Sequence, residues 1–124
     1  MPRALVVDDS RAMRMILSKT LAESGFEVMQ AVNGREALEI MDREGPAIGL
    51  VLLDWNMPEV TGIEVVEQLR SQKAFNTVRV VMVTTETEIE QMARALEAGA
   101  DEYVMKPFTR EAVEDKLRLI GAIP

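Results

Sequence analysis

Short apolar runs alternate along the chain with segments in which apolar residues recur at helical spacing. The runs of strand length are Ala4–Val7, Glu27–Ala31, Leu50–Leu53, Val78–Val83 and Tyr103–Met105. This alternation is typical of βαβ units, in which a helix connects two parallel strands. The runs at Leu50 and Val78 also lack polar alternation, as expected of strands covered by helices on both faces. The pattern predicts an α/β fold with a doubly wound, five-stranded parallel sheet.

The helical segments begin at residues that can cap the free N–H groups of a first turn. The expected capping residues are Ser10, Asn33, Thr61, Thr87 and Thr109. Thr61 and Thr87 are each followed three residues later by the glutamate of a capping box. Glycines stand where the first, second and fourth helices should end. These elements fill all 124 residues, which we expect to form a single domain.

Polar residues stand at the ends of four of the apolar runs. Asp8 and Asp9 follow the first run, Asp54 the third, Thr84 the fourth and Lys106 the fifth. Right-handed crossovers bring the carboxyl ends of parallel strands to one edge of the sheet. Any one of these residues alone is more often a loop or cap residue. Because four strand ends converge, we expect a shared site in the crevice at this edge.

Composition narrows the chemistry of such a site. The chain has no cysteine and no histidine, so disulfides, thiolate metal sites and thiol nucleophiles are excluded. Oxygen ligands remain, and they suit hard cations such as Mg²⁺, Mn²⁺ or Ca²⁺ rather than zinc or copper. The net charge of −7 argues against DNA as a partner. We find neither a signal peptide nor a run of membrane-spanning length, and expect a cytoplasmic protein without a membrane partner.

Three converging carboxylates repel one another unless a cation neutralises them. Mg²⁺ usually takes one or two protein carboxylates and retains water or phosphate oxygens as its other ligands. We therefore expect Asp9 and Asp54 to bind the ion directly and Asp8 to act through water. The backbone carbonyl of Asn56 is a further expected ligand.

The open positions of such a cation suit a phosphoryl group. Its charge would be shared with the ammonium of Lys106 and the hydroxyl of Thr84. No obvious base lies near Ser10 or Thr84 to activate a hydroxyl nucleophile, so a carboxylate is the expected nucleophile. Asp54, in the middle of the group, is the residue that we select.

The motifs VVDDS, LLDWNMPEVTG, VVMVTTE and YVMKP, in this order, are similar to those of the receiver domain of two-component response regulators. The resemblance covers essentially the whole chain, and DWNMP is most similar to stand-alone chemotaxis regulators. It implies the flavodoxin-like strand order 2-1-3-4-5 that is known for this family. It also implies that Asp54 accepts a phosphoryl group from a phosphohistidine of a sensor histidine kinase or phosphotransfer protein. Lys106 would pair with the phosphoryl oxygens, and its bond to Pro107 would be cis.

The same resemblance implies a switch and an output face. Thr84 and Tyr103 would change position on phosphorylation and alter a surface made by the fourth helix, fifth strand and fifth helix. A downstream protein, which the sequence does not identify, would bind there. The expected partner surface is Ile89, Met92, Leu96, Tyr103 and Lys116, with Ala95 and Ala98 turned towards the sheet. Judged by spacing alone, the apolar stripe of the fourth helix is more often core.

Two other functions remain open. A haloacid dehalogenase-type phosphatase also uses an aspartate, Mg²⁺, a hydroxyl and a lysine, but Asn56 stands where its motif has a second aspartate. A pseudo-receiver would retain the fold and bind partners without phosphorylation. We expect a phosphoacceptor that catalyses its own phosphorylation and dephosphorylation, and not a turnover enzyme.

Overall fold

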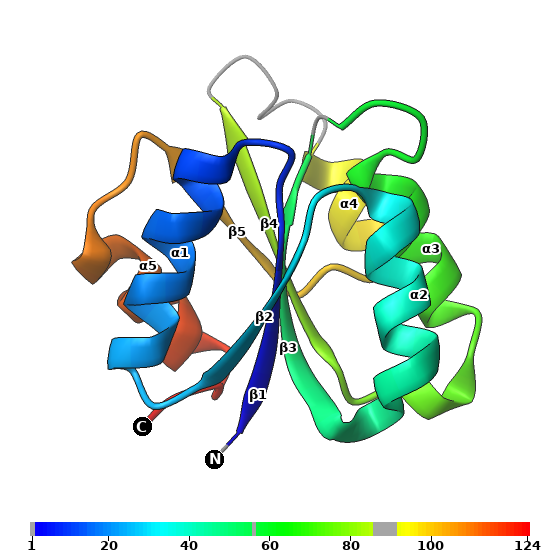
Figure 1. Ribbon diagram of the computed structural model, residues 1–124, viewed down its shortest axis with the longest axis horizontal. Helices are drawn as coiled ribbons and strands as arrows, with labels where there is room; N and C mark the ends of the chain where they lie inside the picture. The colour runs from blue at the N-terminus through cyan, green and yellow to red at the C-terminus, as the bar shows by residue number, and fades with distance from the viewer. Residues whose placement is uncertain (1, 56, 86–91) are drawn as a thin grey trace.

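The computed structural model describes residues 2–55, 57–85 and 92–124. Its strands are all parallel and form one five-stranded sheet in the order β2-β1-β3-β4-β5 (Figure 1). They are β1 (Arg3–Val7), β2 (Glu27–Ala31), β3 (Ile48–Asp54), β4 (Arg79–Thr85) and β5 (Glu102–Lys106). The predicted fold class, single domain and strand order are confirmed.

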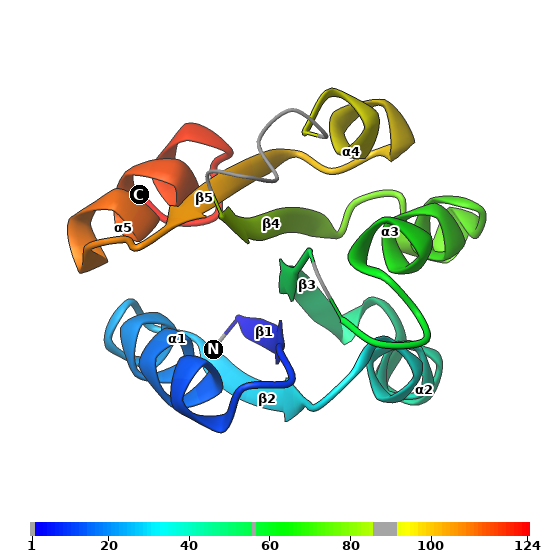
Figure 2. The ribbon, with the colours of Figure 1, turned by 90° about the horizontal axis from the view of Figure 1, so that it is seen from above.

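Helices cover both faces of this sheet. They are α1 (Arg11–Glu23), α2 (Gly34–Glu44), α3 (Gly62–Arg70), α4 (Met92–Ala98) and α5 (Arg110–Leu119). Seen from above, α1 and α5 lie on one face, and α2, α3 and α4 lie on the other (Figure 2). Two short 3₁₀ helices, η1 (Gly45–Ala47) and η2 (Lys73–Phe75), were not predicted. No helix in the described ranges combines the length and apolar character needed to cross a membrane.

Strand β1 shows how the sequence produces two cores. Its residues Ala4 and Val6 belong to the cluster beneath α1 and α5, whereas Leu5 and Val7 belong to the cluster beneath α2, α3 and α4. All four are almost fully buried. Apolar side chains on both faces explain why the strand lacks polar alternation. The two cores hold the central strands rigidly, and with them the polar residues at the strand ends.

The helix caps follow the sequence closely. The N-caps confirmed are Ser10, Asn33, Thr61 and Thr109, each accepting a hydrogen bond from the backbone N–H three residues later. Both hydrogen bonds of the capping box at Thr61 are present. The box expected at Thr87 lies outside the described residues. Gly99 follows α4 with φ of 122°, the left-handed conformation that glycine adopts most readily.

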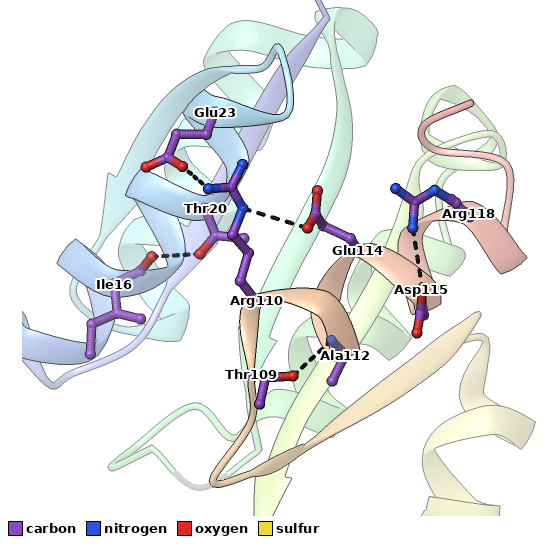
Figure 3. Close-up of polar contacts among 9 residues, drawn as sticks. All are labelled: Ile16, Thr20, Glu23, Thr109, Arg110, Ala112, Glu114, Asp115 and Arg118. Atoms are coloured by element: carbon purple, nitrogen blue, oxygen red, sulfur yellow. Dashed lines mark hydrogen bonds and ion pairs between the residues drawn. The ribbon is translucent and has the colours of Figure 1, made fainter.

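Polar contacts join α1 to α5 on one face of the sheet (Figure 3). Arg110, in the first turn of α5, pairs with Glu23 at the end of α1. The same guanidinium lies 3.5 Å from a carboxylate oxygen of Glu114, one turn further along α5. The start of α5, which follows the loop after β5, is therefore tied to α1.

Candidate functional site

The polar residues predicted to converge do lie at the carboxyl ends of the parallel strands. The strands end at the upper edge of the sheet in Figure 1. Asp8 and Asp9 follow the last residue of β1, and Asp54 is the last residue of β3. Lys106 is the last residue of β5, and Thr84 is the penultimate residue of β4. Parallel pairing of all the strands sets these positions, because each strand begins at the opposite edge.

Three carboxylates form the centre of the site. Asp8, Asp9 and Asp54 each place an oxygen within 4.8 Å of the others. Asp8 and Asp54 are only 1% and 5% exposed, whereas Asp9 is exposed. The ammonium of Lys106 lies 3.3 Å from Asp54 Oδ1 and 3.5 Å from Asp8 Oδ2. One half-buried cation therefore faces two buried carboxylates, and the group as a whole has an excess of negative charge.

This environment changes the proton affinity of Asp54. Burial raises the pKa of its carboxyl from 3.8 to about 6; repulsion by Asp8 adds to the increase, and Lys106 opposes it. Burial alone would lower the pKa of Lys106, but attraction to Asp54 and Asp8 outweighs it, and that pKa is raised. Near pH 7 the Asp54 carboxyl is therefore mostly ionised, although its surroundings favour the protonated form. A second cation would relieve this repulsion.

The donor set fits a hard divalent ion. Asp8 Oδ1 accepts a hydrogen bond of 2.8 Å from the backbone N–H of Ser10. Asp8 Oδ2 is buried and faces the Lys106 ammonium at 3.5 Å, but it accepts no hydrogen bond of normal geometry from the described residues. Carboxylate oxygens with spare acceptor capacity, gathered within a few ångströms, are the ligands that Mg²⁺ and Mn²⁺ prefer. The expected ligand Asn56 lies outside the described residues.

Two residues that were not assigned to the site support its backbone. Arg14 donates from Nη1 to the carbonyl oxygen of Asp8 at 2.9 Å and so ties α1 to the acidic loop. Gly62 lies so close to Asp54 that a Cβ atom there would meet the Asp54 carbonyl oxygen at 2.7 Å. In the sequence, Gly62 stands out only as part of the TGIE capping box, and Arg14 only as one of several charges on a helix.

Thr84 lies near Asp54 on the adjacent strand β4, and Trp55 follows Asp54 along the chain. Thr84 is fully buried, and its Oγ1 donates to the carbonyl oxygen of Thr85 at 3.3 Å. Trp55 is 9% exposed and packs in the core beneath α2, α3 and α4. The cis peptide bond expected between Lys106 and Pro107 is confirmed.

The expected exposure of the partner surface is only partly correct. Leu96 is 44% exposed, and Ala95 is buried as expected. Met92 is 4% exposed and belongs to the core, so its predicted exposure was wrong. The reason is that α4 turns Met92 and Ala95, which are three residues apart, towards the sheet. Ile89 lies outside the described residues.

Comparisons with known proteins agree with this geometry. The sequence model of the family described as response regulator receiver domain matches residues 4–118. Chemotaxis protein CheY1 of Helicobacter pylori is 39% identical over 119 residues, which are 95% of this chain and 95% of that protein. The chemotaxis protein CheY homolog of Campylobacter jejuni is 38% identical over 116 residues, covering 93% of this chain and 88% of that protein. The crystallised chemotaxis protein CheY4 of Vibrio cholerae matches with a TM-score of 0.88 and 35% identity, over 97% of this chain and 98% of that one.

Proposed function

The chain belongs to the response regulator receiver domain family, as a CheY-type member, and from this premise we propose that Asp54 is its phosphoacceptor. The placement of Asp54 carries the proposal. Its carboxylate is 5% exposed, lies 3.3 Å from the Lys106 ammonium and is gathered with Asp8 and Asp9. These 124 residues contain no histidine, so the phosphohistidine donor lies outside them. We propose a sensor histidine kinase or a phosphotransfer protein as that donor, acting in the cytoplasm.

The transfer is a displacement at phosphorus. A carboxylate oxygen of Asp54 attacks the phosphorus atom, and an O–P bond forms while the N–P bond to the donor imidazole breaks. The imidazole nitrogen retains the bonding electrons and is protonated from solvent. Lys106, already paired with Asp54, moves its ammonium onto the phosphoryl oxygens and neutralises part of their charge. Hydrolysis later restores the carboxylate: water attacks the phosphorus, the O–P bond to Asp54 breaks, and inorganic phosphate leaves.

We propose Mg²⁺, or Mn²⁺ in its place, as the cation of this site. Asp9 and Asp54 would bind it directly and Asp8 through water, with Asn56 adding its carbonyl oxygen. When bound, the ion neutralises the carboxylates and the charge on the transferring phosphoryl group. The buried oxygen of Asp8 that lacks a hydrogen bond, and the raised pKa of Asp54, support this proposal.

Phosphorylation would alter the output face through Thr84 and Tyr103. The acyl phosphate offers the Thr84 hydroxyl a charge-assisted hydrogen bond in exchange for its present bond of 3.3 Å to the Thr85 carbonyl. That preference shifts the population towards the arrangement in which Thr84 approaches the phosphate. The surface that includes Leu96, Tyr103 and Lys116 would then bind a downstream protein. We propose a self-catalysed phosphoacceptor and not a turnover enzyme.

Labelling with radioactive acetyl phosphate in the presence of Mg²⁺ tests the acceptor. We expect stoichiometric labelling of the wild-type chain and none of Asp54→Asn. Asp42→Asn, a change at an exposed aspartate of α2, is the matched control and should label normally. Full labelling of Asp54→Asn would place the acceptor elsewhere. An unlabelled wild-type chain would favour a pseudo-receiver, and multiple turnover of a small phosphate ester would favour a phosphatase.

A further inference from the structure

Glu102, Tyr103 and Lys116 form a compact cluster at β5, the edge strand of the sheet between α4 and α5 (Figure 2). Glu102 Oε1 accepts a hydrogen bond of 3.0 Å from the backbone N–H of Tyr103. The same oxygen lies 3.3 Å from the ammonium of Lys116. That ammonium also lies 4.7 Å from the centroid of the Tyr103 ring. One cation therefore binds a carboxylate and an aromatic ring at the same time.

The cluster connects the two faces of the sheet. Tyr103 packs partly against the core beneath α2, α3 and α4. Lys116 stands on α5, whose residues Val113 and Leu117 belong to the opposite core. The lysine side chain thus reaches around the edge of β5 to meet the ring. This contact is possible only while the ring stays near that edge, because a ring turned inward beneath α4 is separated from α5 by the strand itself.

The environment favours the contact. The side chain of Glu102 is 17% exposed and that of Lys116 is 33% exposed, so neither charge is fully hydrated. Partial removal of water strengthens both an ion pair and a cation–π contact relative to an exposed surface pair. Glu102 also holds the lysine from a second direction, which reduces the number of side-chain rotamers that compete with the contact.

We propose that Glu102 and Lys116 form a latch that holds the Tyr103 ring at the outer edge of β5 and so opposes the change of the output face. The inference rests on the proposed function, in which the phosphorylated site draws Tyr103 inward. Tyr103 pairs in register with Met82, and Thr84, two residues further along β4, points to the same face. A shift of Thr84 therefore acts on the side of the sheet to which the ring would turn. The latch holds the ring from the side of α5, and so opposes the inward position in the equilibrium between the two positions of the ring.

The single tyrosine of the chain allows a direct test. Protein labelled with 3-fluorotyrosine should show one ¹⁹F resonance, which reports on Tyr103 alone. We would compare wild type with Lys116→Met, Lys116→Arg and Glu102→Gln, each with and without Mg²⁺ and beryllofluoride, a mimic of the acyl phosphate. Lys73→Met is the matched control, since Lys73 is exposed and makes no ion pair with the residues that the structure describes. Circular dichroism and urea unfolding confirm that each variant is folded.

The variants should differ already without beryllofluoride. Lys116→Met and Glu102→Gln should move the resonance towards its position in the beryllofluoride-bound wild type. Lys116→Arg should keep the resonance at its wild-type position, because arginine also pairs with a carboxylate and a ring. The beryllofluoride concentration for half-maximal response should fall by about two- to fivefold in Lys116→Met, the range expected for losing one partly exposed cation–π contact. Lys73→Met should match wild type.

A resonance in Lys116→Met that coincides with that of wild type, with and without beryllofluoride, would overturn the latch. So would an equal change in Lys73→Met. A wild-type resonance that does not respond to beryllofluoride would instead contradict the proposed switch. In that case the variants without beryllofluoride still decide whether Lys116 positions the ring.

Discussion

Replacing Asp54 by asparagine should stabilise the metal-free protein, although it removes the proposed acceptor. Burial and the charge of Asp8 raise the pKa of Asp54 to about 6 from 3.8, its value in an unfolded chain. Ionised Asp54 therefore lowers the free energy of unfolding near neutral pH. At roughly 1.4 kcal/mol per pKa unit, the free-energy cost is about 3 kcal/mol. Asparagine has a similar shape and no charge, so it avoids this cost.

The measured increase in the free energy of unfolding should be smaller than this limit of about 3 kcal/mol. Lys106 loses one of its two partners in Asp54→Asn and retains Asp8, at 3.5 Å. Its half-buried ammonium then has less neighbouring negative charge to compensate it. We expect the free energy of unfolding to increase by about 1 to 2 kcal/mol at pH 7.5.

The pH dependence identifies the cause. At pH 7.5 the Asp54 carboxyl is ionised in the folded and unfolded chains alike, and the cost is fully present. As the pH falls through 6 towards 4, the folded protein takes up a proton that the unfolded chain does not, and the cost declines. At pH 3.5 the carboxyl is mostly protonated in both states, and wild type and Asp54→Asn should have nearly equal stability.

Urea unfolding followed by Trp55 fluorescence, in a chelator and between pH 3.5 and 8, measures this difference. Asp42→Asn again provides the control, since Asp42 is exposed. Addition of Mg²⁺ should reduce the difference in stability, because wild type gains a cation that Asp54→Asn binds poorly. An Asp54→Asn protein no more stable than wild type at pH 7.5 in chelator would refute the reasoning. A gain that does not change with pH would refute it as well.

Three further predictions concern the site and its support. Mg²⁺ at ten times its dissociation constant should stabilise wild type by about 1.4 kcal/mol, seen as a higher melting temperature and a change in Trp55 emission, and an unchanged melting curve would contradict the cation site. Gly62→Ala should lower the free energy of unfolding by about 1 to 3 kcal/mol and reduce acetyl phosphate labelling, because the added Cβ would displace the backbone of Asp54. Gly49→Ala is the control and should not reduce labelling, because the added Cβ there meets no neighbouring atom within 4 Å. Thr61→Ala should lower the free energy of unfolding by about 1 kcal/mol through loss of the α3 cap, and an unaltered urea midpoint would argue against that cap.

The convergence of Asp8, Asp54 and Lys106 could be predicted because it depends on topology. Apolar runs fix where the strands lie, and right-handed crossovers fix which ends meet, so residues at those ends are neighbours whatever the details of packing. The caps at Ser10 and Thr61 were equally predictable, since they depend on contacts within four residues.

Features that depend on helix rotation or long-range packing were not predictable. Met92 and Leu96 are both apolar and one turn apart, and hydrophobicity does not say which of them faces the sheet. The small Ala95 lets α4 approach the sheet closely, with Met92 inside and Leu96 outside. The contact of Lys116 with Tyr103 joins two elements across an edge of the sheet, and no local pattern marks it.

The acidic site around Asp54 and the cluster of Glu102, Tyr103 and Lys116 differ in their electrostatics. The acidic centre is electrostatically unfavourable by itself, as the raised pKa of Asp54 shows, so a bound cation would relieve repulsion that is already present. The proposed phosphorylation would add negative charge, which Lys106 and that cation would neutralise. At β5 the opposite holds, because Glu102 and Lys116 satisfy each other and retain the Tyr103 ring. The favourable free energy available at the site must therefore exceed that of the latch before the output face changes. Since the two sets of residues share no side chain, substitutions at the latch should alter the threshold of the response while leaving the side chains that act at Asp54 in place.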